Sequence, residues 1–152
     1  MRQQPSRNRV EQWCAWAACA LAVAAAAVSL VVTAAGSNRV HGVALPLAVA
    51  AAMLATSVFT SGRSGWLAGL LYGVAALTVL YAMILALSLP VRLAVEGTCS
   101  PAGMPCPLGF ERPATGAETF ATYSAVIASA AALLLIFAAV EARYLRNPRR
   151  SP

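Results

Sequence analysis

The sequence predicts an all-α membrane protein in which four transmembrane helices form an antiparallel bundle. The chain of 152 residues is 60% hydrophobic and only 11% charged, whereas soluble domains average about 45–50% apolar and about 25% charged residues. The charges fall outside four long uncharged segments, and the one long polar interval lies between the third and the fourth. A chain of this length supports a single domain.

The first predicted transmembrane helix covers residues 13–35 and follows a basic tail at residues 1–12. As a helix it would extend about 35 Å, enough to cross a hydrocarbon core of about 30 Å. A cleaved signal peptide is the alternative, because arginines precede the segment and small residues end it at Val32 to Ala34. The apolar run exceeds the roughly 7–15 residues of a signal-peptide core, so we expect an uncleaved helix.

The second and third predicted spans cover residues 43–60 and 66–89. Residues 61–65 connect them so tightly that the two helices must form an antiparallel hairpin. We expect Pro90 to end the third span, since proline lacks the backbone N–H that a helix interior needs.

Three glycines of the third segment, Gly65, Gly69 and Gly73, are spaced four residues apart and share one helix face. Repeated GxxxG spacing lets two helix backbones approach closely in a membrane. We therefore expect a packing seam, in the first place against another helix of the same chain and otherwise between copies. The alternative is a chance pattern in a chain rich in small residues.

The fourth predicted span covers residues 119–140 and ends a transmembrane domain of residues 13–146, followed by a basic tail at 147–152. Thr115 and Glu118 have the spacing of a capping box, which predicts a helix start near Gly116. Small residues share one face of this span, and we expect that face to pack inward: Ala121, Ala125, Ala128 and Ala132. We expect the larger residues beyond it to face lipid: Leu133, Leu134 and Ile136.

The arginines predict that both termini are cytoplasmic, because cytoplasmic loops carry an excess of basic residues. In that orientation the inner segments hold eight arginines: Arg2, Arg7, Arg9, Arg63, Arg143, Arg146, Arg149 and Arg150. The outer segments hold only three: Arg39, Arg92 and Arg112. Trp13, Trp16 and Trp66 would lie at the inner interface, where indole rings are favoured.

The predicted extracytoplasmic loop, residues 90–118, carries Cys99 and Cys106. Disulfides form and persist outside the cytoplasm, so we expect these two cysteines to be bonded. By contrast, Cys14 and Cys19 fall within the first span, where cysteine behaves as a small apolar residue.

The sequence contains no pattern that we interpret as a catalytic, cofactor-binding or metal site. Its single histidine, His41, has no neighbouring cysteine or carboxylate, and the basic residues concentrate in the tails rather than along a nucleic-acid-binding stripe. Every charged residue is expected in a tail, a loop or a helix end, which disfavours proton-coupled transport. A thiol–disulfide oxidoreductase is only a third hypothesis, because Cys99 and Cys106 are not a CxxC pair.

These observations favour a non-enzymatic accessory, assembly or interaction subunit of a bacterial cell membrane, without a cofactor. Its expected partners are the lipid bilayer and either another membrane protein or further copies of itself, and no nucleic acid. A small oligomeric channel or permease, with pores lined by serine, threonine and glycine faces, is the alternative from a different functional class.

Overall fold

The protein is all-helical in a computed structural model that describes residues 4–37, 39–61, 64–99 and 108–144. The four helices are α1 (Gln4–Ala34), α2 (His41–Thr60), α3 (Gly65–Glu96) and α4 (Gly116–Tyr144). Within the described ranges there is no strand, only an isolated bridge between Thr98 and Glu111. All four helices are long and apolar enough to cross a membrane, which is compatible with the predicted multi-pass membrane protein.

All four helices extend beyond their predicted spans, and α1 and α3 do so by the most. The helix α1 begins at Gln4, so much of the expected polar tail at residues 1–12 is helical. The prediction that Pro90 ends the third helix is wrong, because α3 continues through Pro90 to Glu96. A proline inside a helix removes one backbone hydrogen bond and commonly bends the helix without ending it.

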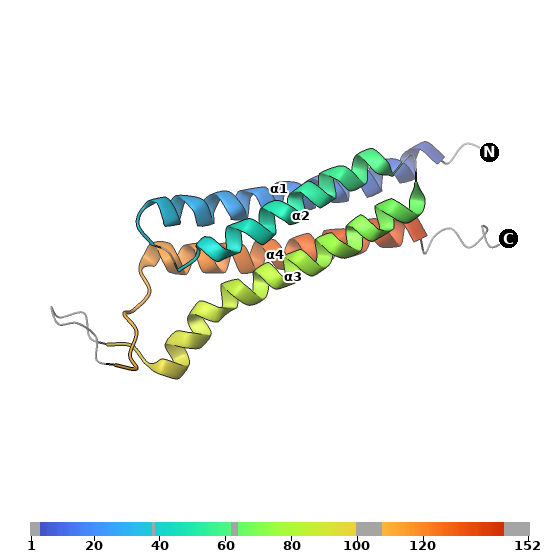
Figure 1. The fold of residues 1–152 in the computed structure, drawn as a ribbon. Coiled ribbons are helices and arrows are strands. Elements are labelled where there is room, and N and C mark those ends of the chain that lie inside the picture. The colour runs from blue at the N-terminus through green and yellow to red at the C-terminus, as the bar shows by residue number, and fades with distance from the viewer. Residues whose placement is uncertain (1–3, 38, 62–63, 100–107, 145–152) are drawn as a thin grey trace.

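The helices form an elongated bundle in which each lies against two neighbours (Figure 1). The main packing pairs are α1–α2, α2–α3, α3–α4 and α1–α4. The start of α1 and the end of α4 lie at one end of the bundle, and the α1–α2 turn lies with the start of α4 at the other. We call these the terminal end and the loop end. Toward the loop end, α3 diverges from the other three helices.

Alanines fill much of the core, especially between α1 and α4. The fully or nearly fully buried alanines of these two helices are Ala15, Ala18, Ala22 and Ala25 on α1, and Ala121, Ala125, Ala132 and Ala139 on α4. Small side chains let helix backbones come close where lipid supplies no hydrophobic drive for association. The predicted inward alanine face of the fourth helix is therefore present, although Ile136 is also buried, contrary to expectation.

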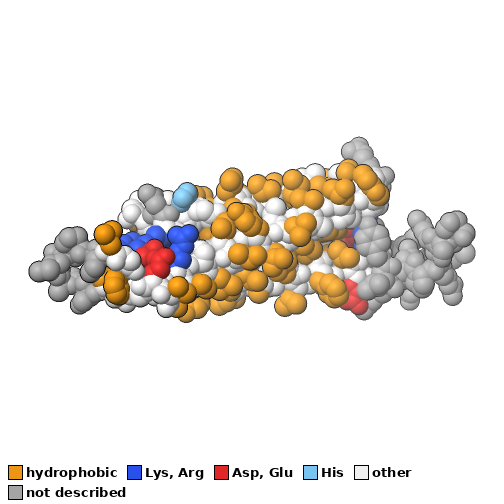
Figure 2. Space-filling view, turned by 60° about the horizontal axis from the view of Figure 1, so that its bottom comes forward, with side chains coloured by type: hydrophobic (Ala, Val, Ile, Leu, Met, Phe, Trp, Pro, Cys, Tyr) orange, Lys and Arg blue, Asp and Glu red, His pale blue; other side chains and the backbone are white. Residues whose placement is uncertain are grey.

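The outer surface of the bundle is rich in exposed large hydrophobic side chains (Figure 2). They include Val31, Leu45, Phe59, Leu77, Ile127 and Leu134, each more than two-thirds exposed. Soluble monomers rarely expose apolar surface this continuously. This distribution, with many small residues inside and large apolar residues on the outer surface, is the one expected of a membrane bundle.

The predicted glycine seam does not join helices of this chain at Gly73. A Cβ atom added there would meet no atom within 4 Å, and one added at Gly65 would meet only the Arg143 guanidinium, at 3.6 Å. The preferred prediction, packing against another helix of the same chain, is therefore wrong for Gly73. Instead, Gly65 and Gly69 line an apolar surface groove with Trp66 and Leu70.

Candidate functional site

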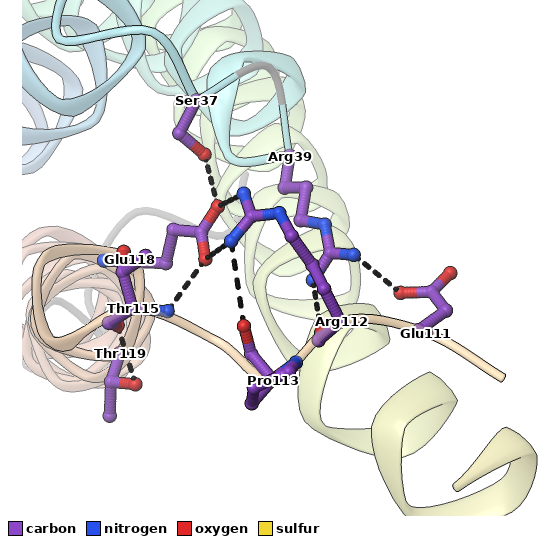
Figure 3. Close-up of polar contacts among 8 residues, drawn as sticks. All are labelled: Ser37, Arg39, Glu111, Arg112, Pro113, Thr115, Glu118 and Thr119. Carbon is purple, nitrogen blue, oxygen red and sulfur yellow. Dashed lines mark hydrogen bonds and ion pairs between the residues drawn. The ribbon is translucent and has the colours of Figure 1, made fainter. Parts of the chain in front are cut away.

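The ion pairs among the described residues lie in two polar clusters, one at each end of the bundle. The loop-base cluster lies at the loop end and consists of Ser37, Arg39, Glu111, Arg112, Thr115 and Glu118 (Figure 3). The helix clamp lies at the terminal end and consists of Glu11, Ser61, Tyr72 and Arg143.

Glu118 is the centre of the loop-base cluster and is completely buried. Its carboxylate accepts hydrogen bonds from the Arg112 guanidinium at 2.6 and 3.2 Å and from the Thr115 backbone N–H at 2.8 Å. The Ser37 hydroxyl, from the α1–α2 turn, donates a further hydrogen bond. A buried carboxylate requires such partners, because an unpaired charge away from water is strongly unfavourable.

The first turn of α4 places Glu118 in this position. The Thr115 hydroxyl accepts a 3.2 Å hydrogen bond from the Glu118 backbone N–H, while the Glu118 carboxylate reaches back to the Thr115 backbone. This reciprocal arrangement is the predicted capping box, and α4 begins at Gly116 as expected. Glu118 therefore both caps the helix and anchors the residues that precede it.

Arg39 makes a second connection between the α1–α2 turn and the loop. Its guanidinium donates to the Arg112 carbonyl at 3.0 Å and forms an ion pair with Glu111 at 3.2 Å (Figure 3). Both side chains of that pair are about one quarter exposed, at 23% and 27%. Together with Ser37, this contact fastens the residues just before α4 onto the α1–α2 turn.

The loop segment after α3 is paired with the same residues. The Cys99 N–H donates to the Glu111 carbonyl at 3.0 Å, and the Glu111 N–H donates to the Gly97 carbonyl at 3.2 Å. Gly97 has a φ of +78°, and a side chain there would come within 3.2 Å of the Phe110 ring. Gly97 thus combines a positive-φ conformation that favours glycine with close approach to an aromatic ring, and its pairing with Glu111 joins the two ends of the loop.

The helix clamp connects the other end of the bundle. Arg143 of α4 forms an ion pair with Glu11 of α1, and the Tyr72 hydroxyl of α3 donates to the same carboxylate at 3.3 Å. A second Arg143 nitrogen donates to the Ser61 carbonyl at the end of α2, at 3.3 Å. One arginine–glutamate pair therefore links all four helices.

The ion pair between Glu11 and Arg143 was not predicted from the sequence, in which the two residues lie near opposite ends of the chain. In the structure only 8% of Glu11 is exposed, and it extends the buried alanine face of α1 by one turn. The signal was present in the spacing, since Glu11, Ala15, Ala18 and Ala22 follow helical periodicity. Its partners could not be inferred, because Tyr72 and Arg143 lie far away in the sequence.

The predicted disulfide lies only partly within the described residues. Cys99 is at the base of the loop, but Cys106 lies outside the described ranges, so the bond stays a prediction. Cys14 and Cys19 are half-buried and unbonded, and the Cys19 thiol donates to the Ala51 carbonyl at 3.4 Å. Among the described residues no group of three histidine, cysteine, aspartate or glutamate side chains could hold a metal ion.

Comparisons with protein-family models, curated proteins and solved structures give no match for this chain. Proposals for its function must therefore come from the two clusters and the surfaces around them.

Proposed function

We propose that this protein is a non-enzymatic accessory or interaction subunit of a bacterial cell membrane that presents the α3–α4 loop to a partner protein. The observation that carries the proposal is the loop-base cluster. It fastens both ends of the loop, at Gly97–Cys99 and Glu111–Thr115, to each other and to the α1–α2 turn. A loop held in place in this way loses less conformational entropy when it binds, which favours recognition.

Exposed apolar residues next to the cluster provide a contact surface. Leu108 is fully exposed and Phe110 is half exposed, although both belong to the loop rather than to the lipid-facing bundle. Aromatic and aliphatic side chains on a fixed support are typical anchors of protein–protein interfaces. The position of the Phe110 ring is fixed on one side, because the ring packs against Gly97.

The proposed orientation has both termini in the cytoplasm and the loop outside. It is supported by the eight-to-three arginine distribution in the sequence. Trp13 and Trp66, each 74% exposed at the terminal end, suit the headgroup level on the cytoplasmic side.

In this orientation the Cys99–Cys106 bond would form in an oxidising compartment and add about 2–3 kcal/mol by closing a small loop. We expect the intact protein, alkylated without reduction, to take up no label at either cysteine. Labelling at both positions would contradict the bond while leaving the loop-base cluster as the anchor.

A small oligomeric channel or permease is the second candidate, favoured by the exposed glycine face of α3. A second copy could pack on the groove lined by Gly65, Trp66, Gly69 and Leu70. Because side chains, many of them alanine, fill the interior of the bundle, a solute path would run between copies rather than through a single bundle.

The test is purification of the tagged full chain from its native membrane in a mild detergent or nanodiscs, followed by native mass spectrometry. We expect a stoichiometric second protein that is lost in a Leu108→Asp, Phe110→Ala variant. A Leu134→Ala variant, altered at a lipid-facing residue that is 72% exposed, is the matched control and should retain the partner. A closed homo-oligomer without a partner would instead support the channel, and a monomer would contradict both.

A further inference from the structure

The last turns of α3 reach beyond the thickness of the hydrocarbon core. The helix has 32 residues and is therefore about 48 Å long, against a hydrocarbon core of about 30 Å. A tilt near the upper limit of about 40° would still leave roughly 37 Å along the membrane normal. With exposed Trp66 at the interface of the terminal end, the excess falls at the other end of α3, after about residue 86 without tilt and about residue 92 at that tilt.

The lipid-facing surface of α3 nevertheless continues into this excess. Exposed apolar residues follow one face of the helix at intervals of three or four residues: Leu77, Tyr81, Ile84, Leu87, Val91 and Val95. The final member, Val95, is 79% exposed, more than the residues in the middle of the helix. The apolar face therefore runs without interruption from the hydrocarbon core into the headgroup layer.

The opposite face of the last turns of α3 packs against the other helices. Leu89 is buried in a cluster with Val32, Val40 and Ala121, and Leu93 packs against that cluster. Toward this end α3 diverges from its neighbours, as Figure 1 shows. Val91 and Val95 consequently face away from the protein, and the exposed Arg92 lies beside them.

We propose that residues 91–96 of α3 form an interfacial foot that lies in the headgroup layer on the loop side of the membrane. Val91 and Val95 contact the upper part of the acyl chains, and Arg92 contacts lipid phosphate. Amphipathic helical segments with aliphatic and basic residues bind the interface in this manner. Because Glu96 directly precedes Gly97, the foot fixes the height at which the loop leaves the membrane. This surface is distinct from the proposed partner site at Leu108 and Phe110.

The proposal can be tested by fluorescence of single tryptophans in the full-length protein. Trp13, Trp16 and Trp66 are replaced by phenylalanine, and Val95→Trp or Val91→Trp is introduced in that background. The matched control is Leu108→Trp, at a fully exposed loop position. Each variant is purified without any partner and reconstituted in vesicles of phosphatidylcholine and phosphatidylglycerol, with or without lipids brominated near the top of the acyl chain.

We expect blue-shifted emission at both α3 positions, with quenching by brominated lipid roughly twofold or more above the Leu108→Trp control. Aqueous iodide should quench the Leu108→Trp control more strongly than the tryptophans at positions 91 and 95. The protection of the α3 tryptophans from iodide should be independent of the protein-to-lipid ratio, because contact with lipid causes it. Iodide quenching equal to that of the control would overturn the proposal, as would protection that disappears when the protein is diluted in lipid, since contact between copies would then be its cause.

Discussion

The two polar clusters differ in how their members are distributed along the sequence, and this difference separates two roles. In the loop-base cluster Glu118 has two local partners, Thr115 and Arg112, three and six positions away, and one distant partner, Ser37, 81 positions away. In the helix clamp, Glu11 is 61 positions from Tyr72 and 132 from Arg143. The first cluster therefore combines a local helix cap with contacts to the α1–α2 turn, whereas the second forms only when all four helices have assembled.

Solvent access separates the clusters further. The side chains of Glu11 and Arg143 are only 11% and 13% exposed, so both charges of that pair are sheltered from water. In the other cluster Glu118 is fully buried, but Arg112 is 46% exposed and can be solvated without its partner. Breaking the clamp should therefore destabilise the whole bundle, and breaking the loop-base cluster should act mainly on the loop.

The largest effect is expected for Arg143→Ala. Among the described residues it leaves the buried Glu11 carboxylate with Tyr72 alone, and removal of one partner from a buried ion pair costs about 3–5 kcal/mol. The free energy of unfolding in micelles, from a denaturant titration, measures this loss. Arg39→Ala is the control, because its ion pair with Glu111 is partly exposed and should cost about 1 kcal/mol or less. Equal losses in the two variants would mean that the clamp does not hold the bundle together.

An intermediate effect is expected for Arg112→Ala. Glu118 keeps its hydrogen bonds from Ser37 and Thr115, so the loss should be about 1.5–3 kcal/mol, the range for hydrogen bonds to a charged group. The change should also increase the rate at which protease cleaves the loop in sealed vesicles, while the rest of the bundle stays protected. If cleavage spreads to the helices, the cluster supports the fold rather than the loop alone.

The contrast between the clusters also explains what could be predicted from the sequence. The four spans follow from uncharged runs of sufficient length, and the start of α4 follows from the local spacing of Thr115 and Glu118. Pro90 was misjudged because packing of Leu89 and Leu93 keeps α3 helical past the proline. The helix clamp depends on which helices become neighbours, and no local pattern contains that information.

A smaller effect is expected for Tyr72→Phe, which removes the phenol hydroxyl from the clamp but keeps the ring. Glu11 retains its ion pair with Arg143, so the loss should be about 1 kcal/mol, typical of a single hydrogen bond. The same denaturant titration measures it, and the Arg143→Ala, Tyr72→Phe double variant tests whether the two contacts act together. Strictly additive losses would contradict a shared network, because both side chains bind one carboxylate oxygen.

The smallest effect on the single chain is expected for Gly73→Leu. Gly73 is exposed and a Cβ atom added there meets no atom within 4 Å, so the free energy of unfolding of the monomer should change by no more than about 0.5 kcal/mol. Ala75→Leu is the matched control two positions away, where the alanine is completely buried and overpacking should cost about 1–3 kcal/mol. If Gly73→Leu leaves monomer unfolding unchanged but reduces the amount of oligomer in native mass spectrometry, the glycine face packs between copies. If it changes neither, the spacing of Gly65, Gly69 and Gly73 has no packing role.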